Sequence, residues 1–508
     1  MQKFYLTTPI YYINDKPHIG HAYCTIVSDT ISRYHRLKGE GVFFLTGTDE
    51  NSQKNVEAAK KAGEQDLQKY LDEQSAVWLK TWKELDITNT DFIRTTEERH
   101  KKGVAKFFKI VFDKGDIYKG TYTGYYCTGC EAFVRESDLS DGVCPHHKTA
   151  PQKIEEENYF FRASAYRDRL LAHIEAHPEF VQPESRRHEI VNYITDHFED
   201  VSISRKNVLG CGIPLSIDPD QVVYVWFDAL INYLTGVGYG TDDSMFSKWW
   251  PADVHIVGKD IIKFHCALWP AMLLSAELAL PKKVFAHGFF TINGEKISKS
   301  LGNAIDPLDL ARQYGLDALR YFLLSEIPFG GDGDFSFERV RQRYESDLSK
   351  GLGNFVSRVT TLCSRLEPGQ LKNPTEIADA ALLESTLSDT WRQWEDGFEE
   401  YRLDESISSI WRLLKWGDKH IEENKPWKSA KENPQAFVEC ISGLAEVVRQ
   451  VSLLIKPILP GTAEKIEKIL GVADFHVQNP FAVTKRFGAV TITKVQKAEP
   501  LFPPLSTS

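Results

Sequence analysis

The chain lacks any long apolar run. Its 508 residues contain no segment close to the roughly 18 consecutive apolar residues that a membrane helix needs. The first residues, Met1–Leu6, show neither the basic start and apolar stretch of a signal peptide nor an Arg-rich transit segment. Internal repeats and low-complexity segments are also absent. These absences argue against a membrane protein or a secreted protein, and we expect the chain to be cytoplasmic.

A surplus of basic charge is missing too. The chain has 61 Lys and Arg against 71 Asp and Glu, which gives a net charge of −10. A general nucleic-acid binder usually carries a basic surplus, because phosphate contacts dominate its affinity. Any RNA partner would therefore be bound through local basic patches and specific contacts. The charge neither supports nor excludes such a partner.

The length predicts more than one hydrophobic core, while the composition is that of an ordinary globular protein. Residues 3–8 are predicted to form a strand, residues 18–38 a helix that ends at Gly39, and residues 42–46 a buried strand. This βαβ order predicts a doubly wound, Rossmann-type parallel sheet, in which ligands bind at the carboxyl ends of the strands. Two more strands, Val254–Val257 and Val284–His287, continue the same pattern.

The sheet is predicted to be split and then followed by helices. A turn-rich insertion that contains cysteines separates its two halves. After residue 345, apolar residues recur at three- and four-residue spacing, as in Leu387, Trp391, Trp394 and Phe398, which predicts an α-helical bundle. A short β-rich tail is expected at Ala489–Thr493. The predicted parts are residues 1–115 and 224–290 (catalytic sheet), 116–223 (insertion), 291–345 (a loop and stem-contact region) and 346–508 (bundle and tail).

The cysteines predict a metal site. Cys127 and Cys130 are separated by two residues, and Cys144 and His147 follow after 13 more with the same spacing. This pattern matches a tetrahedral zinc knuckle of the Cys₃His type, and four protein ligands leave no open position for catalysis. The expected zinc is therefore structural, with one ion per chain, and His146 is the alternative fourth ligand.

Two short motifs predict phosphate binding. His18-Ile19-Gly20-His21 falls between the first strand and its helix, where phosphates meet the helix N-terminus. Gly20 allows the backbone to approach a ligand closely, and imidazoles can donate hydrogen bonds to phosphate oxygens. Taken alone, two histidines near a helix start are more often solvated or capping groups.

The second motif is Lys296-Ile297-Ser298-Lys299-Ser300, which follows a tight turn at Asn293-Gly294. Two lysines three residues apart form a cationic loop that can close over a triphosphate and stabilise charge on pyrophosphate. Alone, this stretch would be read as an exposed polar loop.

In this order around a split doubly wound sheet, the two motifs resemble the HIGH and KMSKS signatures of class I aminoacyl-tRNA synthetases, with Ile297 replacing Met. The resemblance implies that ATP, taken with Mg²⁺, activates an amino acid to an aminoacyl-adenylate, which is then transferred to the 3′-terminal adenosine of a tRNA. It implies that His18, Gly20 and His21 contact the phosphates and that Lys296 and Lys299 stabilise the transition state. Gly258 and Asp260 would hold the adenosine.

The segments Thr7–Tyr12, Val225–Tyr233 and Ala286–Gly288 are similar to the methionyl branch of this class. In that branch the thioether lies among aromatic rings, where sulfur–aromatic contacts contribute about 0.3–1.5 kcal/mol. The resemblance implies that Asp49 pairs with the substrate ammonium. It assigns the rest of the L-methionine pocket to Pro9, Ile10, Tyr12, Trp226, Tyr233 and His287. Trp226 and Tyr233 are seven residues apart, so they could instead share the core face of one helix.

One motif departs from the branch. Its members commonly continue Asp-Glu-His-Gly after the second strand, whereas this chain has Asp49-Glu50-Asn51-Ser52. The ammonium-binding Asp49 is retained, so recognition of the substrate amino group should be retained too. No role of the replaced His can be carried over to this chain.

The helical part resembles the anticodon-reading segments of the branch at Leu352–Arg358 and Asn424–Lys428. Single-stranded RNA loops are read by stacking and by hydrogen bonds to base edges. The resemblance implies that Trp427 stacks on the first anticodon base and that Asn354 and Arg358 bind bases of CAU, in initiator and elongator tRNA(Met). It also implies a monomer, since the chain ends near the close of the bundle.

Other functions fit less well. Synthetases for valine, isoleucine and leucine usually carry a larger editing domain than residues 116–223 can hold, and the cysteinyl enzymes bind zinc within the substrate site. Small nucleotidyltransferases share an H-x-G-H element but lack the helical bundle. A non-catalytic tRNA-binding protein would have lost the phosphate-contacting residues, which are all present here.

Overall fold

The computed structural model describes residues 2–127, 132–134, 139–145, 149–207, 210–292, 294–297 and 304–505. The chain divides into two compact units. One, here called the sheet unit, comprises residues 3–17 and 42–287; the other, the helical unit, comprises residues 1–2, 18–41 and 288–508. In these described ranges no helix is both long and apolar enough to span a bilayer.

The sheet unit is built on six strands in the order β3-β2-β1-β12-β13-β7. The pairs β2–β3, β1–β12, β12–β13 and β13–β7 run parallel, with Leu6 opposite Val254. The strands are β1 (Lys3–Tyr12), β2 (Gly41–Asp49), β3 (Asp91–Arg94), β7 (Val181–Gln182), β12 (Val254–Gly258) and β13 (Val284–His287). The predicted doubly wound parallel sheet is confirmed. Its order reverses between β1 and β12, which puts the expected ligand crevice at the carboxyl ends of these strands.

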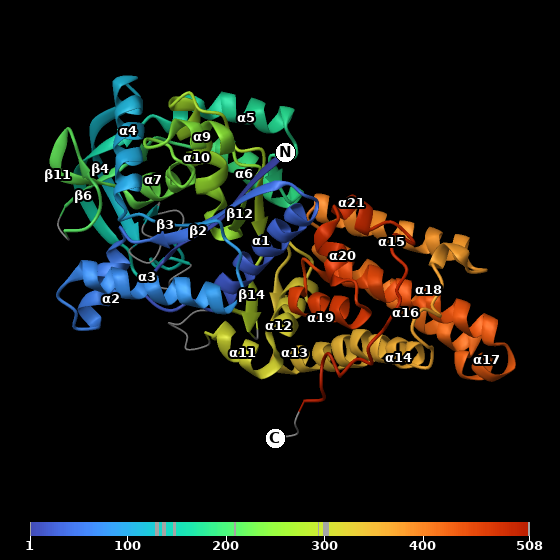
Figure 1. Ribbon diagram of the computed structural model, residues 1–508. Helices are drawn as coiled ribbons and strands as arrows, with labels where there is room; N and C mark the ends of the chain where they lie inside the picture. The colour runs from blue at the N-terminus through green and yellow to red at the C-terminus, as the bar shows by residue number, and fades with distance from the viewer. Residues whose placement is uncertain are drawn as a thin grey trace. The chain divides into compact units, whose positions relative to one another are not determined.

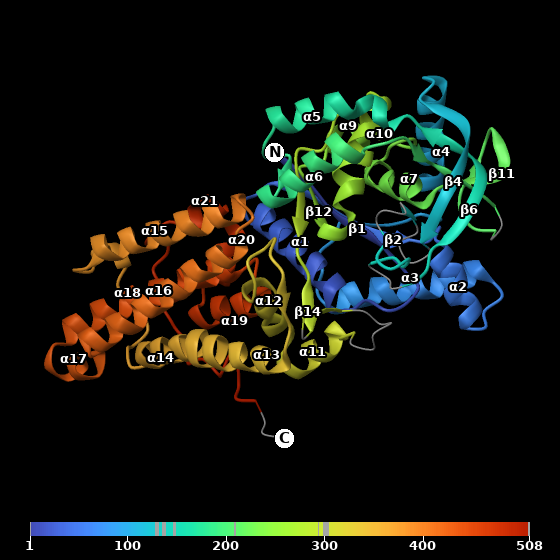
Figure 2. The ribbon, with the colours of Figure 1, turned by 180° about the vertical axis from the view of Figure 1, so that it is seen from behind.

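Helices cover the sheet because its central strands are apolar on both faces, with Tyr5, Leu6, Phe44 and Leu45 fully buried. Figures 1 and 2 show α4, α7 and α10 on one side of β1 and β2, and α2 and α3 on the other. The helices are α2 (Gln53–Lys61), α3 (Leu67–Glu84), α4 (Glu98–Asp113), α7 (Val225–Leu230), α8 (Asn232–Thr235), α9 (Asp243–Trp249), the 3₁₀ turn η3 (Lys259–Ile261), the π-helix η4 (Phe264–Leu268) and α10 (Trp269–Ser275).

The insertion adds two antiparallel sheets to this unit. Its main ladder joins β4 to β6, from Ile117 opposite Phe161 to Tyr126 opposite Gln152. Its elements are β4 (Ile117–Cys127), β5 (Ala132–Val134), β6 (Gln152–Phe161), η2 (Ala163–Tyr166), α5 (Arg167–Ala176), α6 (Glu184–His197), β8 (Val201–Ser202), β9 (Ser204–Lys206), β10 (Pro214–Leu215) and β11 (Asp218–Val223). The insertion also supplies β7, which pairs with β13 at the edge of the main sheet. The insertion is therefore anchored to the sheet that it interrupts.

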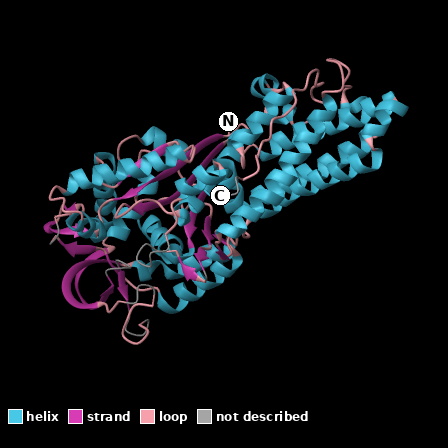
Figure 3. Cartoon of the chain, turned by 90° about the horizontal axis from the view of Figure 1, so that it is seen from below, coloured by secondary structure: helices cyan, strands magenta, loops and turns pink. Residues whose placement is uncertain are grey.

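The helical unit contains α1 (Ile19–Leu37), a small sheet and the C-terminal bundle. The small sheet has the order β15-β14-β16, formed by Glu295–Lys296, Phe290–Ile292 and Gly333–Asp334. Figure 3 shows the long helices of the bundle side by side in cyan. The helices after the small hairpin are α11 (Pro307–Tyr314), α12 (Leu316–Ser325), α13 (Phe337–Arg343), the π-helix η6 (Tyr344–Gly353), α14 (Asn354–Cys363), η7 (Pro374–Glu376), α15 (Ala380–Glu399), α16 (Leu403–Asn424), α17 (Pro426–Glu432), α18 (Pro434–Ile455), α19 (Pro460–Leu470), α20 (Ala473–Gln478) and α21 (Phe481–Thr484).

The prediction of a β-rich tail is wrong. Residues 489–493 form no strand, and their polar groups bond to loop residues instead. The carbonyl of Thr493 accepts a hydrogen bond from the Gly369 amide at 2.8 Å, and the Thr491 hydroxyl accepts one from Asn373 at 3.1 Å. The β-branched residues favour extended backbone, but no neighbouring strand completes a ladder.

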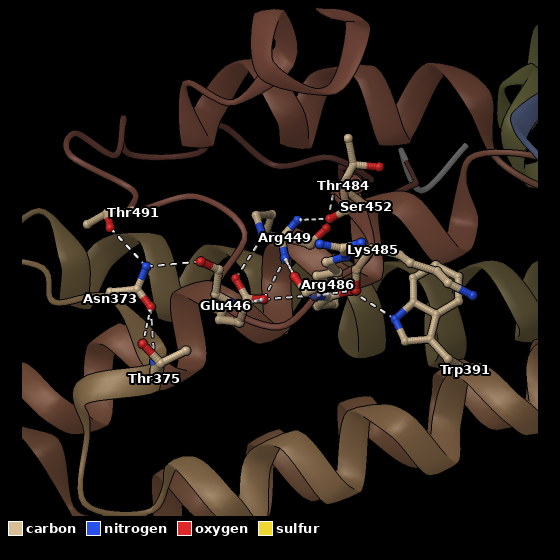
Figure 4. Close-up of polar contacts among 12 residues, drawn as sticks. Asn373, Thr375, Trp391, Glu446, Arg449, Ser452, Thr484, Lys485, Arg486 and Thr491 are labelled. Atoms are coloured by element: carbon tan, nitrogen blue, oxygen red, sulfur yellow. Dashed lines mark hydrogen bonds and ion pairs between the residues drawn. The ribbon is translucent and has the colours of Figure 1, made fainter. Parts of the chain in front are cut away.

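A buried polar cluster ties the segment after α21 to α18 (Figure 4). The Arg449 guanidinium pairs with Glu446 at 2.6 Å and donates to the carbonyls of Thr484 at 2.6 Å and Arg486 at 2.9 Å. Trp391 donates to the Gln450 side chain at 2.9 Å. Because the fully buried Arg449 guanidinium donates to the carbonyls of Thr484 and Arg486, residues 484–486 are held against α18.

Candidate active site

His18 and His21 meet at the N-terminus of α1. Their rings stack with centroids 3.8 Å apart. The Nδ1 atom of His18 accepts a hydrogen bond from the Gly20 amide at 3.1 Å, and the Nδ1 atom of His21 accepts one from the His18 amide at 3.2 Å. Since both Nδ1 atoms act as acceptors, the proton of each neutral ring lies on Nε2. The helix start therefore presents imidazole N–H donors where the helix dipole favours an anion.

The helix that carries these histidines is anchored within the helical unit by a buried ion pair. Arg320 of α12 donates to Asp29 at 2.8 Å and to the Thr30 hydroxyl at 3.1 Å. The same guanidinium donates to the carbonyls of Pro457 and Ile458, at 3.1 and 2.9 Å, after the end of α18. Neither charged side chain of the pair is exposed to solvent. Arg320 thus fixes α1 to the last helices of the bundle.

The predicted lysine loop starts from a hairpin. β14 and β15 pair antiparallel around Gly294, whose φ of 77° is the left-handed conformation that the predicted turn requires. Lys296 lies on β15 and Ile297 is buried, while Lys299 lies outside the described residues. The apolar residue of this motif is therefore used for packing.

An aromatic wall in the sheet unit contains two predicted methionine-binding residues. Trp226 of α7 stacks on Phe264 with parallel rings 3.8 Å apart, and the two rings are partly buried. The Tyr233 hydroxyl of α8 donates to His265 Nε2 at 2.8 Å, because His265 Nδ1 donates to the Ile261 carbonyl at 3.0 Å. The His265 ring stands edge-on to Trp226 at 6.5 Å. Trp226 and Tyr233 do not share the face of one helix, because α7 ends before α8 begins.

This wall is rigid and uncharged. The carbonyl of Tyr233 accepts a hydrogen bond from the Tyr5 hydroxyl at 2.7 Å. The centroid of the Tyr233 ring lies 4.3 Å from the centroid of the His255 ring. Burial lowers the pKa of His265 to about 4, and burial holds the pKa of His255 well below its usual range. The Trp226 Nε1 atom is buried and has no hydrogen-bond partner in the described part of the chain. A neutral, polarizable wall of this kind suits an apolar thioether.

Phe264 and His265 were not predicted. They lie in a π-helical turn directly after the segment Gly258–Asp260, and such turns occur frequently at functional sites. The signal that could have identified them is their position, a few residues beyond the carboxyl end of a central strand. The wider turn itself has no sequence periodicity by which it could be recognised.

The remaining predicted substrate residues of the sheet unit lie at carboxyl ends of parallel strands. Pro9, Ile10 and Tyr12 end β1, and Asp49 ends β2 with 3% of its surface exposed. His287 is the last residue of β13, Gly258 is the last of β12, and the exposed Asp260 follows in η3. These are the strand ends at which a doubly wound sheet binds its ligands.

The two residues that depart from the methionyl pattern have local partners. Ser52 is the N-cap of α2 and accepts a hydrogen bond from the Lys54 amide at 3.1 Å. Asn51 donates to the Asp228 carboxylate at 2.8 Å, across 177 residues of sequence. Both residues are therefore hydrogen-bonded within the structure at the end of β2.

The predicted metal site is only partly described. Cys127 ends β4 and Cys144 follows the turn at Ser140–Val143, and both thiols are buried. Cys130, His146 and His147 lie outside the described residues. Among those that are described, no three His, Cys, Asp or Glu side chains form a metal-binding group. Two buried cysteines that form no disulfide with each other fit the donor set of a structural zinc.

The predicted anticodon residues lie on neighbouring elements of the helical unit. Asn354 is exposed at the start of α14, and Arg358 follows one turn later. Arg358 donates to Asp418 and Glu422 of α16, each at 2.6 Å. Trp427 on α17 is 41% exposed, which is unusual for so large an apolar side chain. α17 directly follows α16, so Trp427 and the partners of Arg358 are close in sequence.

Comparison with known proteins agrees with this arrangement. The family described as tRNA synthetases class I (M) matches residues 4–153 and 134–360, and the anticodon-binding domain of tRNA ligase matches residues 381–499. The methionine–tRNA ligase of Thermotoga maritima is 46% identical over 473 residues, covering 91% of this chain and 74% of that protein. The methionine–tRNA ligase of Streptomyces coelicolor is 41% identical over 513 residues, covering 97% and 95%.

Solved structures agree as well. The methionyl-tRNA synthetase of Mycobacterium tuberculosis in complex with methionyl-adenylate superposes with a TM-score of 0.94 at 39% identity, covering 99% of this chain and 100% of that one. Its apo form gives a TM-score of 0.87 at 37% identity, with 99% and 98% covered. The similarity thus extends over the sheet, the insertion and the helical bundle. The chain therefore belongs to the methionyl family of class I aminoacyl-tRNA synthetases.

Proposed function

We propose that the chain is a methionine–tRNA ligase that activates L-methionine with ATP and transfers it to the 3′-terminal adenosine of tRNA(Met), both initiator and elongator. The observation that carries this proposal is the match over 99% of the chain to a solved synthetase that holds methionyl-adenylate. The aromatic wall and the stacked histidines described above supply the chemistry that such an adenylate needs.

In the first step, the methionine carboxylate attacks the α-phosphate of ATP, the bond to the β-phosphate breaks, and pyrophosphate leaves. His18 and His21 donate from Nε2 to phosphate oxygens beside the N-terminus of α1, and Gly20 keeps the backbone there unobstructed. Lys296 and Lys299 stabilise the negative charge of the transition state and of the leaving pyrophosphate. Mg²⁺ bound together with ATP would neutralise further phosphate charge.

The adenosine lies at the carboxyl end of β12 in this proposal. Gly258 lets the backbone approach the nucleoside, and Asp260 accepts hydrogen bonds from the ribose hydroxyls. The exposure of Asp260 supports this role, since the carboxylate is accessible from solvent. In the second step, the ribose hydroxyl of the tRNA attacks the methionyl carbonyl, and AMP leaves.

Methionine is bound in the sheet unit. Asp49 pairs with its ammonium, and the thioether lies against Trp226 and Tyr233. The residues of this pocket that sequence resemblance assigns are Pro9, Ile10, Tyr12, Asp49, Trp226, Tyr233 and His287. Phe264 and His265 join them, because they contact the rings of Trp226 and Tyr233 directly.

The anticodon CAU is read by the bundle. Exposure of Trp427 supports stacking on the first base, and Asn354 is accessible for a base-edge hydrogen bond. Arg358 would bind its base in one of two ways. It keeps its ion pairs with Asp418 and Glu422 and donates from its remaining N–H groups, or it exchanges one of these carboxylates for the base. The ion pairs orient the arginine before RNA arrives.

Cys127, Cys130, Cys144 and His147 are proposed to hold a structural zinc in the insertion, with His146 as the alternative fourth ligand. Two buried cysteines that form no disulfide with each other support this, because they supply two of the sulfur donors that a structural zinc binds. The ion would stabilise the insertion and take no part in the reaction. Three further features stay predictions: the domain limits given above, a monomeric state and a cytoplasmic location. Light scattering after size-exclusion chromatography measures the oligomeric state.

The transfer step is tested by charging tRNA(Met) transcripts with radioactive methionine. We expect charging of transcripts with the anticodon CAU and a loss of more than about 100-fold in kcat/KM when the first anticodon base is replaced, as for the loss of one stacked and hydrogen-bonded base. Charging that ignores the anticodon would contradict the assigned role of the bundle. We propose no second function, because no observation described above favours one.

A further inference from the structure

In the sequence, Asp228 falls between the two proposed methionine-binding aromatics, Trp226 and Tyr233. Its carboxylate is entirely buried. It accepts a hydrogen bond from the Asn51 amide at 2.8 Å through Oδ2 and one from His100 Nε2 at 2.7 Å through Oδ1. A carboxylate can only accept, so the amide and the imidazole must both donate to it. None of these three residues has a role in the proposed chemistry.

His100 joins both helices of the aromatic wall. Its Nε2 atom binds Asp228 on α7, and its Nδ1 atom lies 2.8 Å from the Thr235 hydroxyl on α8, two residues after Tyr233. The imidazole is fully buried. Helix α4 approaches α8 closely here, since a Cβ on Gly103 would come within 2.2 Å of the Thr235 Cγ2 atom. His100 therefore holds α7 and α8 in one fixed relation.

Asn51 ties the same network to the end of β2. Its Nδ2 atom donates to Asp228 and also to the Thr95 carbonyl at 3.3 Å, after β3. The preceding Glu50 is fully buried and is bound by the Arg94 guanidinium at 2.7 and 3.1 Å. The segment from Asp49 to Asn51 is consequently rigid. The residue that lies two positions after the proposed ammonium-binding carboxylate thus binds the helix that carries Trp226.

We propose that Asn51 and His100 are positioning residues for methionine, which act through Asp228. They fix the distance from Asp49, which binds the ammonium, to Trp226 and Tyr233, which bind the side chain, and so determine which amino acid fits between them. This inference rests on the proposed function. None of the three network residues touches the substrate, so their effect should appear in the affinity for methionine and not in the affinity for ATP.

The polarity of the network makes it testable by exchange. Asn51→Asp would put a second carboxylate against that of Asp228. Asp228→Asn would leave one acceptor in place of two, so that its amide nitrogen faces either Asn51 or His100. The double variant restores one donor and one acceptor between the two positions, because the new amide at position 228 can donate to the new carboxylate at position 51. It does not restore the longer contact of 3.3 Å from position 51 to the Thr95 carbonyl. His100 can still donate to the amide oxygen at position 228.

The experiment measures methionine-dependent ATP–pyrophosphate exchange for the wild type, both single variants and the double variant. A buried hydrogen bond to a charged group contributes about 1.5–3 kcal/mol, which corresponds to about 10- to 150-fold in affinity. We expect each single variant to raise the KM for methionine at least about 10-fold with the KM for ATP changed less than about threefold. The double variant should recover part of that loss, because the pair between positions 51 and 228 is restored while the contact to the Thr95 carbonyl is not.

Asn207→Asp is the matched control. Asn207 is an exposed residue of the same unit whose side-chain oxygen accepts from the Gly210 amide at 3.1 Å, a contact that Asp retains. This variant should keep both KM values. Asn51→Ala, which removes the donor without adding charge, is the milder substitution if Asn51→Asp fails to fold, and it should raise the KM for methionine about 10-fold.

The outcomes distinguish a failure of the proposed function from a failure of this inference alone. A wild-type protein without methionine-dependent exchange would refute the proposed function and this inference with it. An active wild type whose Asn51→Asp or Asn51→Ala variant keeps its KM for methionine would refute the inference alone. Parallel increases in the KM values for methionine and for ATP would show a merely structural role and would also refute the inference. The same holds if the KM for methionine of the double variant rises by the combined increases of the two single variants.

Discussion

The Tyr233 hydroxyl lies 2.8 Å from the Nε2 atom of His265, and both side chains are buried in the aromatic wall of the sheet unit. The other ring nitrogen of His265 donates to the Ile261 carbonyl at 3.0 Å, so Nε2 accepts from Tyr233. The pair thereby fixes the tyrosine ring without introducing a charge. A neutral imidazole at this place has a consequence for stability.

Stability should fall as the pH drops below neutrality, in part because of His265. Burial lowers the pKa of His265 to about 4, while the unfolded chain takes up a proton near pH 6.5. Between those values only the unfolded state is protonated, so the free energy of unfolding decreases by about 1.4 kcal/mol per pH unit. Above pH 6.5 this contribution is constant.

The measurement is urea unfolding of the wild type and His265→Gln at pH 7 and pH 5. Gln retains an acceptor for Tyr233 but does not titrate. We expect the wild type to lose about 2 kcal/mol more than the variant between the two pH values. His255 stays as a second source of the acid sensitivity, since burial also lowers its pKa. An equal loss in both proteins would mean that His265 is charged in the folded state.

Arg320→Met should destabilise the helical unit. The variant leaves the Asp29 carboxylate buried with one cation fewer and leaves the carbonyls of Pro457 and Ile458 without their donor. Removal of one partner from a buried ion pair costs about 3–5 kcal/mol, and Arg33, which still contacts Asp29 at 2.6 Å, favours the lower end.

The control for this prediction is Arg312→Met, which removes an exposed arginine paired with Asp309 in the same unit. Its effect on denaturant unfolding should stay below about 1 kcal/mol. An equal decrease in the free energy of unfolding for both variants would show that Arg320 does not fix α1 to the bundle.

Trp427→Ala should impair tRNA charging and leave amino-acid activation intact. Loss of base stacking costs about 1–3 kcal/mol, so kcat/KM for tRNA(Met) should fall roughly 5- to 150-fold. Leu382→Ala is the matched control, because Leu382 is another large apolar residue of the bundle and is 58% exposed. If both variants charge tRNA equally well, Trp427 does not contact the anticodon.

Lys299→Ala should depress the rate of adenylate formation much more than the affinity for methionine. A cation that acts on the developing pyrophosphate is needed in the transition state, and loss of such a group lowers kcat about 100- to 1,000-fold. Single-turnover kinetics separates this rate from methionine binding, and Lys497→Ala serves as a control for a change in charge. Equal losses in rate and in methionine affinity would contradict the assigned role.

Zinc analysis of the purified chain should give one ion per protein. Cys127→Ala should lose that zinc and lower the melting temperature, because a structural zinc contributes directly to folding. Cys211→Ala is the control, since Cys211 is a partly exposed cysteine outside the predicted ligand set. Full zinc content in the Cys127→Ala protein would exclude Cys127 as a ligand.

Strong local patterns in the sequence predicted the framework well. The helix predicted at 18–38 is α1 at Ile19–Leu37, and the strand predicted at Val284–His287 has those limits in the structure. Continuous apolar strands and a helix bounded by a turn leave few alternatives at the local level. His18 and His21 could be located for the same reason, since a helix start follows directly from the βαβ order.

Contacts between distant segments could not be predicted. Asn51 and Asp228 are 177 residues apart in the sequence, and nothing in either segment indicates that β2 ends beside α7. His265 lies in a π-helical turn that the 3.6-residue period does not reveal. Ala489–Thr493 has strand-forming residues, but a strand needs a partner strand, and Gly369 and Asn373, which bond to this segment, lie in a loop.

The most direct test of the account is ATP–pyrophosphate exchange driven by single amino acids, with zinc-loaded protein and methionine, valine, isoleucine, leucine or cysteine. The account predicts exchange with methionine and at most a small fraction of that rate with the others, because the rigid, neutral wall of Trp226, Tyr233, Phe264 and His265 suits an unbranched thioether. Exchange with none of the five would point to a non-catalytic tRNA-binding protein and would contradict the account. Faster exchange with another amino acid would contradict it equally.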